Sequence, residues 1–161
     1  MEDPILARHA VRSFQSTKPS SADIDQLIAA FQAAPCGMGQ NEITQGVVVE
    51  SDEFLQKVEM ATNNAAYGAP LIFVIATKDG SEFGDRNASV AAENVLIEAT
   101  RLGLGSVYVM SGAISLSEHP DLVQQLGIDD GYSPKVIVPI GKATEAYTPT
   151  DRSHRYKLIR R

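Results

Sequence analysis

The sequence predicts a single α+β domain organised as a three-layer sandwich. Its 161 residues, of which 43% are hydrophobic and 21% charged, have the length and composition of one globular domain with a sizeable core. Apolar runs that predict strands and amphipathic patterns that predict helices are mixed along the chain without strict βαβ alternation. This mixture favours a sheet that carries layers of helices.

The first half of the chain predicts a helix, a strand and a short second helix. Residues 20–23 form a helix N-cap with an acid in the first turn. The apolar stripe that follows has the spacing of one helix face and consists of Ile24, Leu27, Ile28 and Phe31. Residues 33–35 end this helix at a proline, and residues 36–45 are predicted as a loop. The β-branched run 47–49 predicts a buried strand, and residues 51–58 predict a short helix with a serine cap.

A long, unusually apolar helix dominates the second half. Turn-forming residues within 63–70 precede a second strand at 71–76, and the helix then runs from Asp85 to a C-cap at Gly103. Apolar side chains cover most of its circumference: Ala88, Ala91, Ala92, Val95, Leu96, Ala99 and Leu102. Its narrow polar stripe consists of Glu93, Asn94, Glu98 and Arg101. Such a helix is buried on more than one side, either as the central core helix or at a subunit interface.

Two more elements complete the predicted domain. Residues 107–109 predict a third strand, and Ser117 caps another helix that ends at Gly127. The fourth strand is predicted at 136–140, where Pro139 suits an edge or a bulge better than the centre of a sheet. The last dozen residues form a basic arm with too little apolar content to fold alone.

Composition excludes several classes of partner. A net charge of −6 argues against nucleic acid as the main ligand, and no apolar run approaches the length needed to span a membrane. The start of the chain lacks the features of a signal peptide, so we expect a cytoplasmic protein. The single cysteine, Cys36, rules out an internal disulfide, and the spacing of histidines and acids predicts no metal site.

The start of the chain carries the clearest candidate binding motif, at residues 8–14. Arg8 and Arg12 lie four residues apart and project from the same side of a helix end or turn. Two guanidinium groups there can bind a phosphate and a second anionic atom. The alternative, pairing with surface acids, is the default for an isolated arginine pair.

Five segments, in order, resemble motifs of the nitroreductase-like family of FMN-dependent oxidoreductases. Residues 8–14 resemble its opening Arg-x-Ser-x-Arg/Lys-x-Phe/Tyr motif, and residues 34–41 its Ala-Pro-Ser-x-x-Asn-x-Gln loop. Residues 93–106 are similar to its core helix and Gly-Leu-Gly-Ser strand entry. Residues 135–141 resemble its strand ending in Ile-Ala-Leu-Gly, and residues 155–158 its C-terminal Arg-x-Pro-Leu signature. The resemblance covers nearly the whole chain.

The resemblance implies a nitroreductase-like dimer fold, an α/β/α sandwich with a mostly antiparallel mixed sheet and a buried central helix. The domain would comprise residues 1–161, with a C-terminal arm, about 147–161, that reaches the partner of a homodimer. FMN would bind in a groove built by both subunits. The resemblance implies these cofactor-binding residues: Arg8, His9, Ala10, Arg12, Pro35, Cys36, Gly37, Gly39, Asn41, Asn63, Met110, Ser111 and Arg155.

The implied roles follow the chemistry of the flavin. Arg8 and Arg155 would hold the phosphate, Arg155 from the same or the neighbouring chain, although other arginines of the arm compete for that role. Arg12 would lie near the pyrimidine edge and stabilise the negative charge that develops on reduction. The main-chain N–H of Ser111 would donate to flavin N5. Asn63, or its neighbour, would approach the polar edge of the flavin, unless both asparagines are simply turn formers.

Several positions depart from the family pattern. Cys36 replaces a serine, and we interpret it as a small side chain rather than a redox group, because a helix C-terminus raises the pKa of a thiol. Ala10, Gly39 and Asn41 remove or shorten polar contacts to the cofactor. Residues 78–84 are short where larger members carry insertions over the pocket, which predicts a more open site.

The resemblance implies an FMN-dependent oxidoreductase that takes electrons from NADH or NADPH and passes them to a small oxidised acceptor such as a nitroaromatic or a quinone. Catalysis would need no side-chain nucleophile, because the flavin carries the redox chemistry. Two other hypotheses remain open. One is a flavin-binding redox sensor or regulatory dimer with little turnover. The other is an α+β interaction protein that has lost the cofactor.

Overall fold

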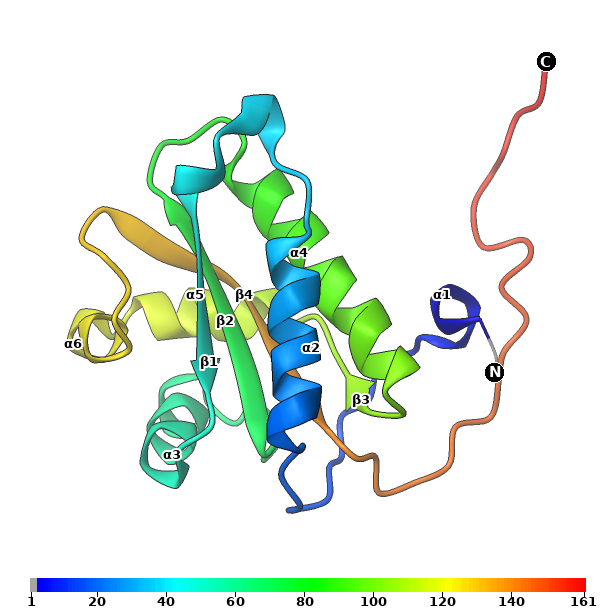
Figure 1. The fold of residues 1–161 in the computed structure, drawn as a ribbon, viewed down its shortest axis with the longest axis horizontal. Helices are drawn as coiled ribbons and strands as arrows, with labels where there is room; N and C mark the ends of the chain where they lie inside the picture. Colours follow the sequence, from blue (N-terminus) through cyan, green and yellow to red (C-terminus); the bar gives the residue numbers. More distant parts are fainter. Residues whose placement is uncertain (1–2) are drawn as a thin grey trace.

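A four-stranded antiparallel sheet forms the middle layer of the protein (Figure 1). The structure, a computed structural model, describes residues 3–161, so the first two residues of the predicted domain lie outside the described part. The strands are β1 (Thr44–Val49), β2 (Leu71–Lys78), β3 (Gly105–Ser106) and β4 (Tyr132–Gly141), in the order β1-β2-β4-β3. All three strand pairs are antiparallel, and Ala10 adds an isolated parallel bridge to Ser106.

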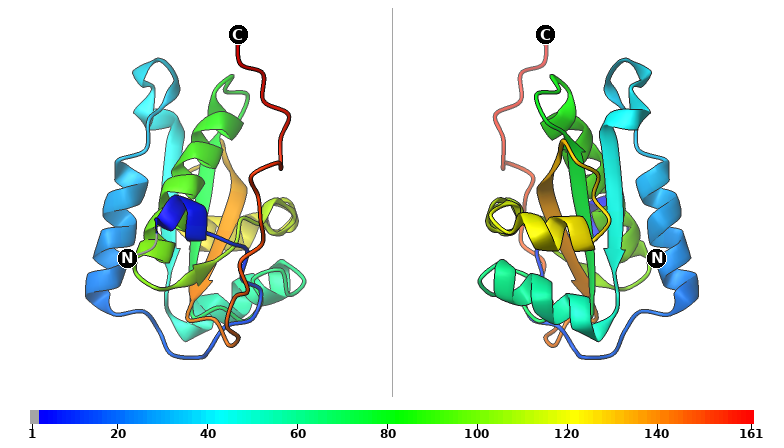
Figure 2. Two further views of the ribbon diagram at one scale, coloured as in Figure 1. Left: turned by 90° about the vertical axis from the view of Figure 1, so that its right-hand side faces the viewer. Right: turned by 90° about the vertical axis from the view of Figure 1, so that its left-hand side faces the viewer.

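Helices cover both faces of this sheet, which confirms the predicted three-layer sandwich (Figures 1 and 2). One layer contains α2 (Ser21–Gln32) and α4 (Gly84–Arg101), with the short α1 (Pro4–Ala7) beside α4. The opposite layer contains α3 (Asp52–Ala61), α5 (Met110–Ser117) and α6 (Pro120–Gln125). Two 3-10 turns, η1 (Gly37–Gly39) and η2 (Asn41–Ile43), connect α2 to β1. None of the helices in the described part of the chain is long and apolar enough to span a membrane.

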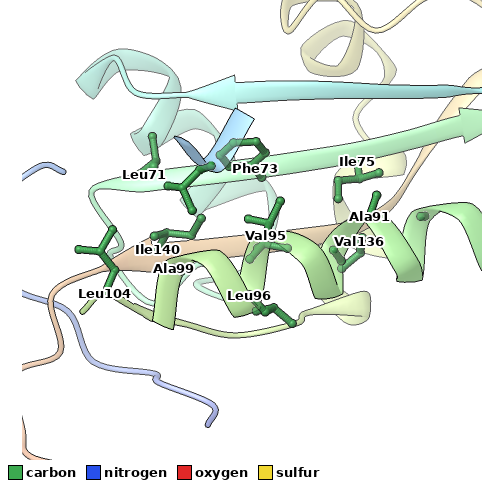
Figure 3. Close-up of a cluster of buried hydrophobic side chains, with 14 residues drawn as sticks. Leu71, Phe73, Ile75, Ala91, Val95, Leu96, Ala99, Leu104, Val136 and Ile140 are labelled. Atoms are coloured by element: carbon green, nitrogen blue, oxygen red, sulfur yellow. The ribbon is translucent and has the colours of Figure 1, made fainter. Parts of the chain in front are cut away.

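The larger core lies between α4 and the sheet (Figure 3). Phe73 and Ile75 of β2 and Val138 of β4 pack against the apolar face of α4, and Leu27 of α2 closes the cluster. Because α2, α1 and the sheet all contact α4, the predicted central helix is confirmed. A second cluster on the opposite face joins β2 to α3 and α5 through side chains such as Val74 and Leu116.

The N-cap predicted at the start of α2 is confirmed, and in the structure it is a capping box. Ser20 Oγ accepts a hydrogen bond from the Asp23 N–H at 3.1 Å, and Asp23 Oδ2 accepts one from the Ser20 N–H at 3.2 Å. Both bonds satisfy N–H groups that a helix terminus otherwise leaves unpaired.

We therefore expect Ser20→Ala to lower the free energy of unfolding by about 1 kcal/mol, the usual loss for a serine N-cap. Urea-induced unfolding followed by circular dichroism measures the change. Ser16→Ala, in the exposed turn before this helix, is the control and should unfold like the wild type. Equal stability of Ser20→Ala and wild type would contradict the assigned cap.

The predicted third strand is wrong, and Pro139 explains why. Pro139 does not lie at an edge, because β4 is flanked by β2 and β3. Its carbonyl accepts a hydrogen bond from the Val107 N–H at 3.3 Å. The N–H and C=O of a strand residue point to the same side, so the donor that proline lacks would also face Val107. The ladder breaks there, leaving the two-residue β3 at 105–106 and a separate bridge between Val109 and Ile137.

The predicted helix cap at Ser117 is also wrong. Ser117 is the last residue of α5, and its hydroxyl donates to the Ala113 carbonyl at 2.9 Å. The next helix, α6, begins at Pro120, which suits a first helical position because it needs no N–H donor there. Small residues give α5 a weak amphipathic pattern, and the helix is stabilised instead by its packing on β4.

Candidate functional site

The Arg8–Phe14 motif is an extended segment fixed along the β3 edge of the sheet. The Val11 N–H donates to the Ser106 carbonyl at 3.0 Å, and Phe14 forms an antiparallel bridge with Ala143 beyond the end of β4. The Thr144 hydroxyl donates to Ser13 Oγ at 2.7 Å. The motif is therefore held between β3 and the chain that leaves β4.

The two arginines of the motif have different surroundings. The Arg8 Nε lies 3.6 Å from Glu93 Oε1 on α4, so Arg8 is directed toward the central helix. Arg12 is exposed, and no carboxylate among residues 3–161 lies within ion-pair distance of it. An unneutralised guanidinium on a protein of net charge −6 is a site for an anion.

His9 and the first residues of the C-terminal arm lie together beside this motif. The His9 and Tyr147 rings stack with centroids 3.5 Å apart and an interplanar angle of 9°. A cavity of about 160 Å³ is lined by residues 9–13 on one side and residues 143–147 on the other. The arm thus returns to the motif of its own chain.

The pKa of the Tyr147 phenol reflects its hydrogen bonds and the arginines near it. Hydrogen bonds from the Thr150 hydroxyl and the Thr150 N–H lower the pKa of Tyr147, and the charges of Arg152 and Arg155 lower it further. The Arg152 Nη1 donates to the Arg8 carbonyl at 2.7 Å, which brings that guanidinium next to the motif. Arg155 lies three residues farther along the exposed arm, with its N–H bonded to the Arg152 carbonyl.

Met110 and Ser111 form the exposed first turn of α5. Val109, the N-cap residue, provides no side-chain cap within the described structure, which leaves the N–H groups of this turn directed outward. The Tyr108 hydroxyl lies 3.0 Å from Ser89 Oγ and joins this segment to α4. The turn at Asn63, a left-handed residue with φ of 54°, lies nearby because its neighbour Ala65 reaches Gly112 of α5.

The loop that follows α2 occupies another part of the molecule. The Gly37 N–H donates to Asn87 Oδ1 at 2.9 Å, which ties the loop to the first turns of α4. A cavity of about 80 Å³ lies beneath it, lined in part by Pro35, Cys36 and Asn41. Figure 1 shows this loop at one end of the molecule, beyond the end of α2, whereas residues 8–14 pass near the opposite end of the sheet. One chain therefore does not bring all the predicted site residues together.

Close packing of Gly105 on the motif predicts the effect of a small substitution. A Cβ at Gly105 would lie 2.7–2.9 Å from three side-chain carbons of Val11. Because these carbons must shift to admit the methyl group, we expect Gly105→Ala to cost at least about 1 kcal/mol of unfolding free energy, the lower end for overpacking. We also expect faster amide hydrogen exchange at Val11, and both effects should diminish when Val11→Ala is added. Slow exchange at Val11 in Gly105→Ala would contradict this packing.

Sequence reasoning did not predict the contacts of Tyr147, whose ring stacks on His9, or of Thr144, whose hydroxyl bonds Ser13. It placed Glu93 on the polar stripe of the central helix, Ser106 at a strand entry and Arg152 among the arginines of the arm, but not their contacts with the motif. The hydroxyl of Ser106 is buried and has no hydrogen-bond partner within residues 3–161. Nor do the described residues contain a cluster of three or more histidines, cysteines or acids that could hold a metal ion.

Curated protein sequences and solved structures both include proteins similar to this chain. A protein of Archaeoglobus fulgidus named "Putative NADH dehydrogenase/NAD(P)H nitroreductase" is 26% identical in an alignment 170 positions long, which covers 95% of this chain and 95% of the relative. A protein of the same name from Methanothermobacter thermautotrophicus is 24% identical over 89% of this chain and 77% of its own length. The crystal structure of a nitroreductase with bound FMN from Bacteroides fragilis superposes with a TM-score of 0.86 at 18% identity, covering 98% of this chain and 97% of the other.

A nitroreductase with bound FMN from Desulfitobacterium hafniense has a TM-score of 0.87, also at 18% identity, and covers 98% of this chain and 96% of its own. At this identity, the two crystal structures show a common fold. The family model for the nitroreductase family matches residues 40–142, from the loop after α2 through the end of β4. Since this match spans well over half of the sequence, the chain belongs to the nitroreductase family.

Proposed function

We propose that this protein is an FMN-dependent oxidoreductase that takes electrons from NADH or NADPH and reduces a small oxidised acceptor such as a nitroaromatic or a quinone. The observation that carries the proposal is the exposed Arg12, which forms no ion pair within the described chain and belongs to the same segment as Arg8, whose carbonyl binds Arg152 of the arm. The names of the curated relatives support the nicotinamide, and the bound FMN of the two crystal structures supports the cofactor.

The charged groups of this region fit the anionic parts of FMN. A phosphate carries close to two negative charges, and guanidinium groups bind it through paired N–H donors. Arg8 and Arg155 are the proposed phosphate ligands, and Arg12 the proposed neighbour of the flavin ring.

The first turn of α5 supplies the proposed backbone donors. Its N–H groups have no partner from a side-chain cap within the described chain, and the helix dipole adds partial positive charge there. We propose that the Ser111 N–H donates a hydrogen bond to flavin N5 and that Met110 lines the flavin site next to it. Neither role depends on the side chain, so the small residues of this turn are compatible with it.

A second copy of the chain completes the proposed site. The Cys36 loop lies away from the Arg8–Phe14 motif within one chain, so its proposed residues Pro35, Cys36, Gly37, Gly39 and Asn41 would come from the partner. Large apolar side chains are exposed on α5, including Met110 and Ile114. Beyond Arg152 the arm extends away from the body of the molecule (Figure 2), and Leu158 is 85% exposed. Exposed apolar surface of this kind is typical of an obligate homodimer.

The chain itself contributes binding, orientation and charge. FMN, when bound, supplies the electron transfer between nicotinamide and acceptor. Arg12 stabilises negative charge at its end of the site through its guanidinium group. Ala10 contributes no hydroxyl to the cofactor, so the guanidinium groups and backbone donors carry more of its binding. The short connection at residues 78–84 leaves room for acceptors of different shape.

An absorption spectrum tests the proposal. Purified protein, with FMN added and excess removed by gel filtration, should keep the visible flavin bands, and NADH or NADPH should then bleach them without oxygen. Reoxidation by a nitroaromatic or a quinone should restore the bands. Flavin bands that nicotinamide bleaches only weakly would favour the regulatory dimer, and protein that binds no FMN would overturn the proposed function.

A further inference from the structure

Two residues of the C-terminal arm, Tyr147 and Arg152, contact the Arg8–Phe14 motif of their own chain. We call this pair the clasp. The Tyr147 ring stacks on His9, inside the motif. Arg152 donates through Nη1 to the Arg8 carbonyl at 2.7 Å and through Nη2 to the Leu6 carbonyl. The clasp therefore engages both the side chain and the backbone of the segment that precedes Arg12.

The backbone contacts of the clasp satisfy groups that helix α1 leaves open. Leu6 lies in the last turn of α1 and Arg8 is its C-cap, so neither carbonyl has a partner within this four-residue helix. A guanidinium is the side chain best suited to bind two carbonyls at once, and its charge also complements the negative end of a helix dipole. Arg152 thus fixes where the chain leaves α1 and enters the motif.

The stack of Tyr147 on His9 is the only aromatic contact recorded for the motif within residues 3–161. Stacked rings restrict both the position and the rotation of the backbone that carries them. Farther along, the Val11–Ser106 and Thr144–Ser13 hydrogen bonds hold the motif from the other side. Arg12 lies between Val11 and Ser13, which these hydrogen bonds hold, and the clasp holds the residues that lead into this part of the motif.

We propose that Tyr147 and Arg152 are positioning residues, which hold the motif of the same chain in the conformation that binds FMN. This inference rests on the proposed function and adds to it two residues that do not themselves contact the cofactor. It also divides the predicted arm: residues 147–152 belong to their own subunit, and residues 153–161 are the part left to reach a partner.

Matched variants of Tyr147 test the clasp. Tyr147→Leu removes the ring, whereas Tyr147→Phe keeps the ring and removes only the hydroxyl bonded to Thr150. In FMN-free protein, the ring protons of His9 should lose their ring-current shift in Tyr147→Leu and keep it in Tyr147→Phe. This measurement needs neither cofactor nor turnover, and it reports the stack directly.

Fluorescence titration with FMN supplies the second measurement. Loss of a stacked pair predicts FMN binding weaker by about 3- to 10-fold in Tyr147→Leu, and within about twofold of wild type in Tyr147→Phe. When His9→Ala is already present, adding Tyr147→Leu should cause little further loss, because its partner ring is gone. The same double-mutant comparison separates positioning from a general loss of stability.

Each result decides a different question. Unchanged His9 ring protons in Tyr147→Leu would show that the clasp does not exist in solution. Shifted ring protons with unchanged FMN affinity would show a clasp that does not position the site, and would overturn the inference while leaving the proposed function intact. Wild-type protein that binds no FMN would instead overturn the proposed function, and the positioning role with it.

Discussion

Arg12→Ala should weaken FMN binding by about 10- to 100-fold, the effect of removing one charge-assisted hydrogen-bonding partner of an anionic ligand. It should leave the free energy of unfolding within about 0.5 kcal/mol of wild type, because surface substitutions without lost contacts rarely exceed that value. Arg12 is exposed and forms no ion pair with the described residues, so the folded protein loses little. Fluorescence titration with FMN and urea unfolding measure the two effects.

Two further variants separate charge from geometry in this prediction. Arg12→Lys keeps the positive charge but loses the planar fork, so its affinity for FMN should lie between those of wild type and Arg12→Ala. Arg101→Ala removes the same charge from the far end of α4, where Arg101 pairs with Glu98, and should bind FMN like the wild type. If Arg12→Ala and Arg101→Ala have equal FMN affinities, the role assigned to Arg12 is wrong.

Elements with a strong local pattern were predicted correctly from the sequence. The N-cap of α2 and the apolar circumference of α4 depend on residues within one helix, so their spacing alone identifies them. Errors occurred where a distant residue decides the structure. Pro139 interrupts the ladder at Val107 across more than thirty intervening residues, and the small residues of α5 form a helix because β4 lies beneath them.

For the candidate site, too, local patterns were identified and contacts between distant residues were not. Residues 8–14 were identified because the two arginines lie only four residues apart in the sequence. The contacts that hold them were not, since Tyr147 and Arg152 lie far from His9 and Arg8 along the chain and no spacing connects them. The resemblance to a family identified the loop at residues 35–41, but only the fold shows that this loop lies away from the arginines of its own chain.

Because of this separation, the proposed site requires a second subunit, and the exposed apolar surface of α5 is where we expect a substitution to disrupt the proposed dimer. Ile114 is 57% exposed on α5, one helical turn from Met110, which is 59% exposed. Tyr108 extends the apolar surface toward Val90 on α4 through its contact with Ser89. A carboxylate at position 114 of this surface would be buried in the proposed dimer without a partner, yet solvated in the monomer.

Ile114→Asp should therefore weaken the dimer by about 100-fold or more, because twofold symmetry places the unfavourable carboxylate in the interface twice. The monomer should remain folded, since aspartate at an exposed helical position costs only about 0.5 kcal/mol. Light scattering with size-exclusion chromatography measures the mass, and circular dichroism checks the fold. Met60→Asp is the matched control, because Met60 is 82% exposed on a different helix, α3.

A monomeric wild type, or an Ile114→Asp protein that stays dimeric, would contradict this interface. Loss of FMN binding together with the dimer in Ile114→Asp, but not in Met60→Asp, would mean that the cofactor needs residues from both chains.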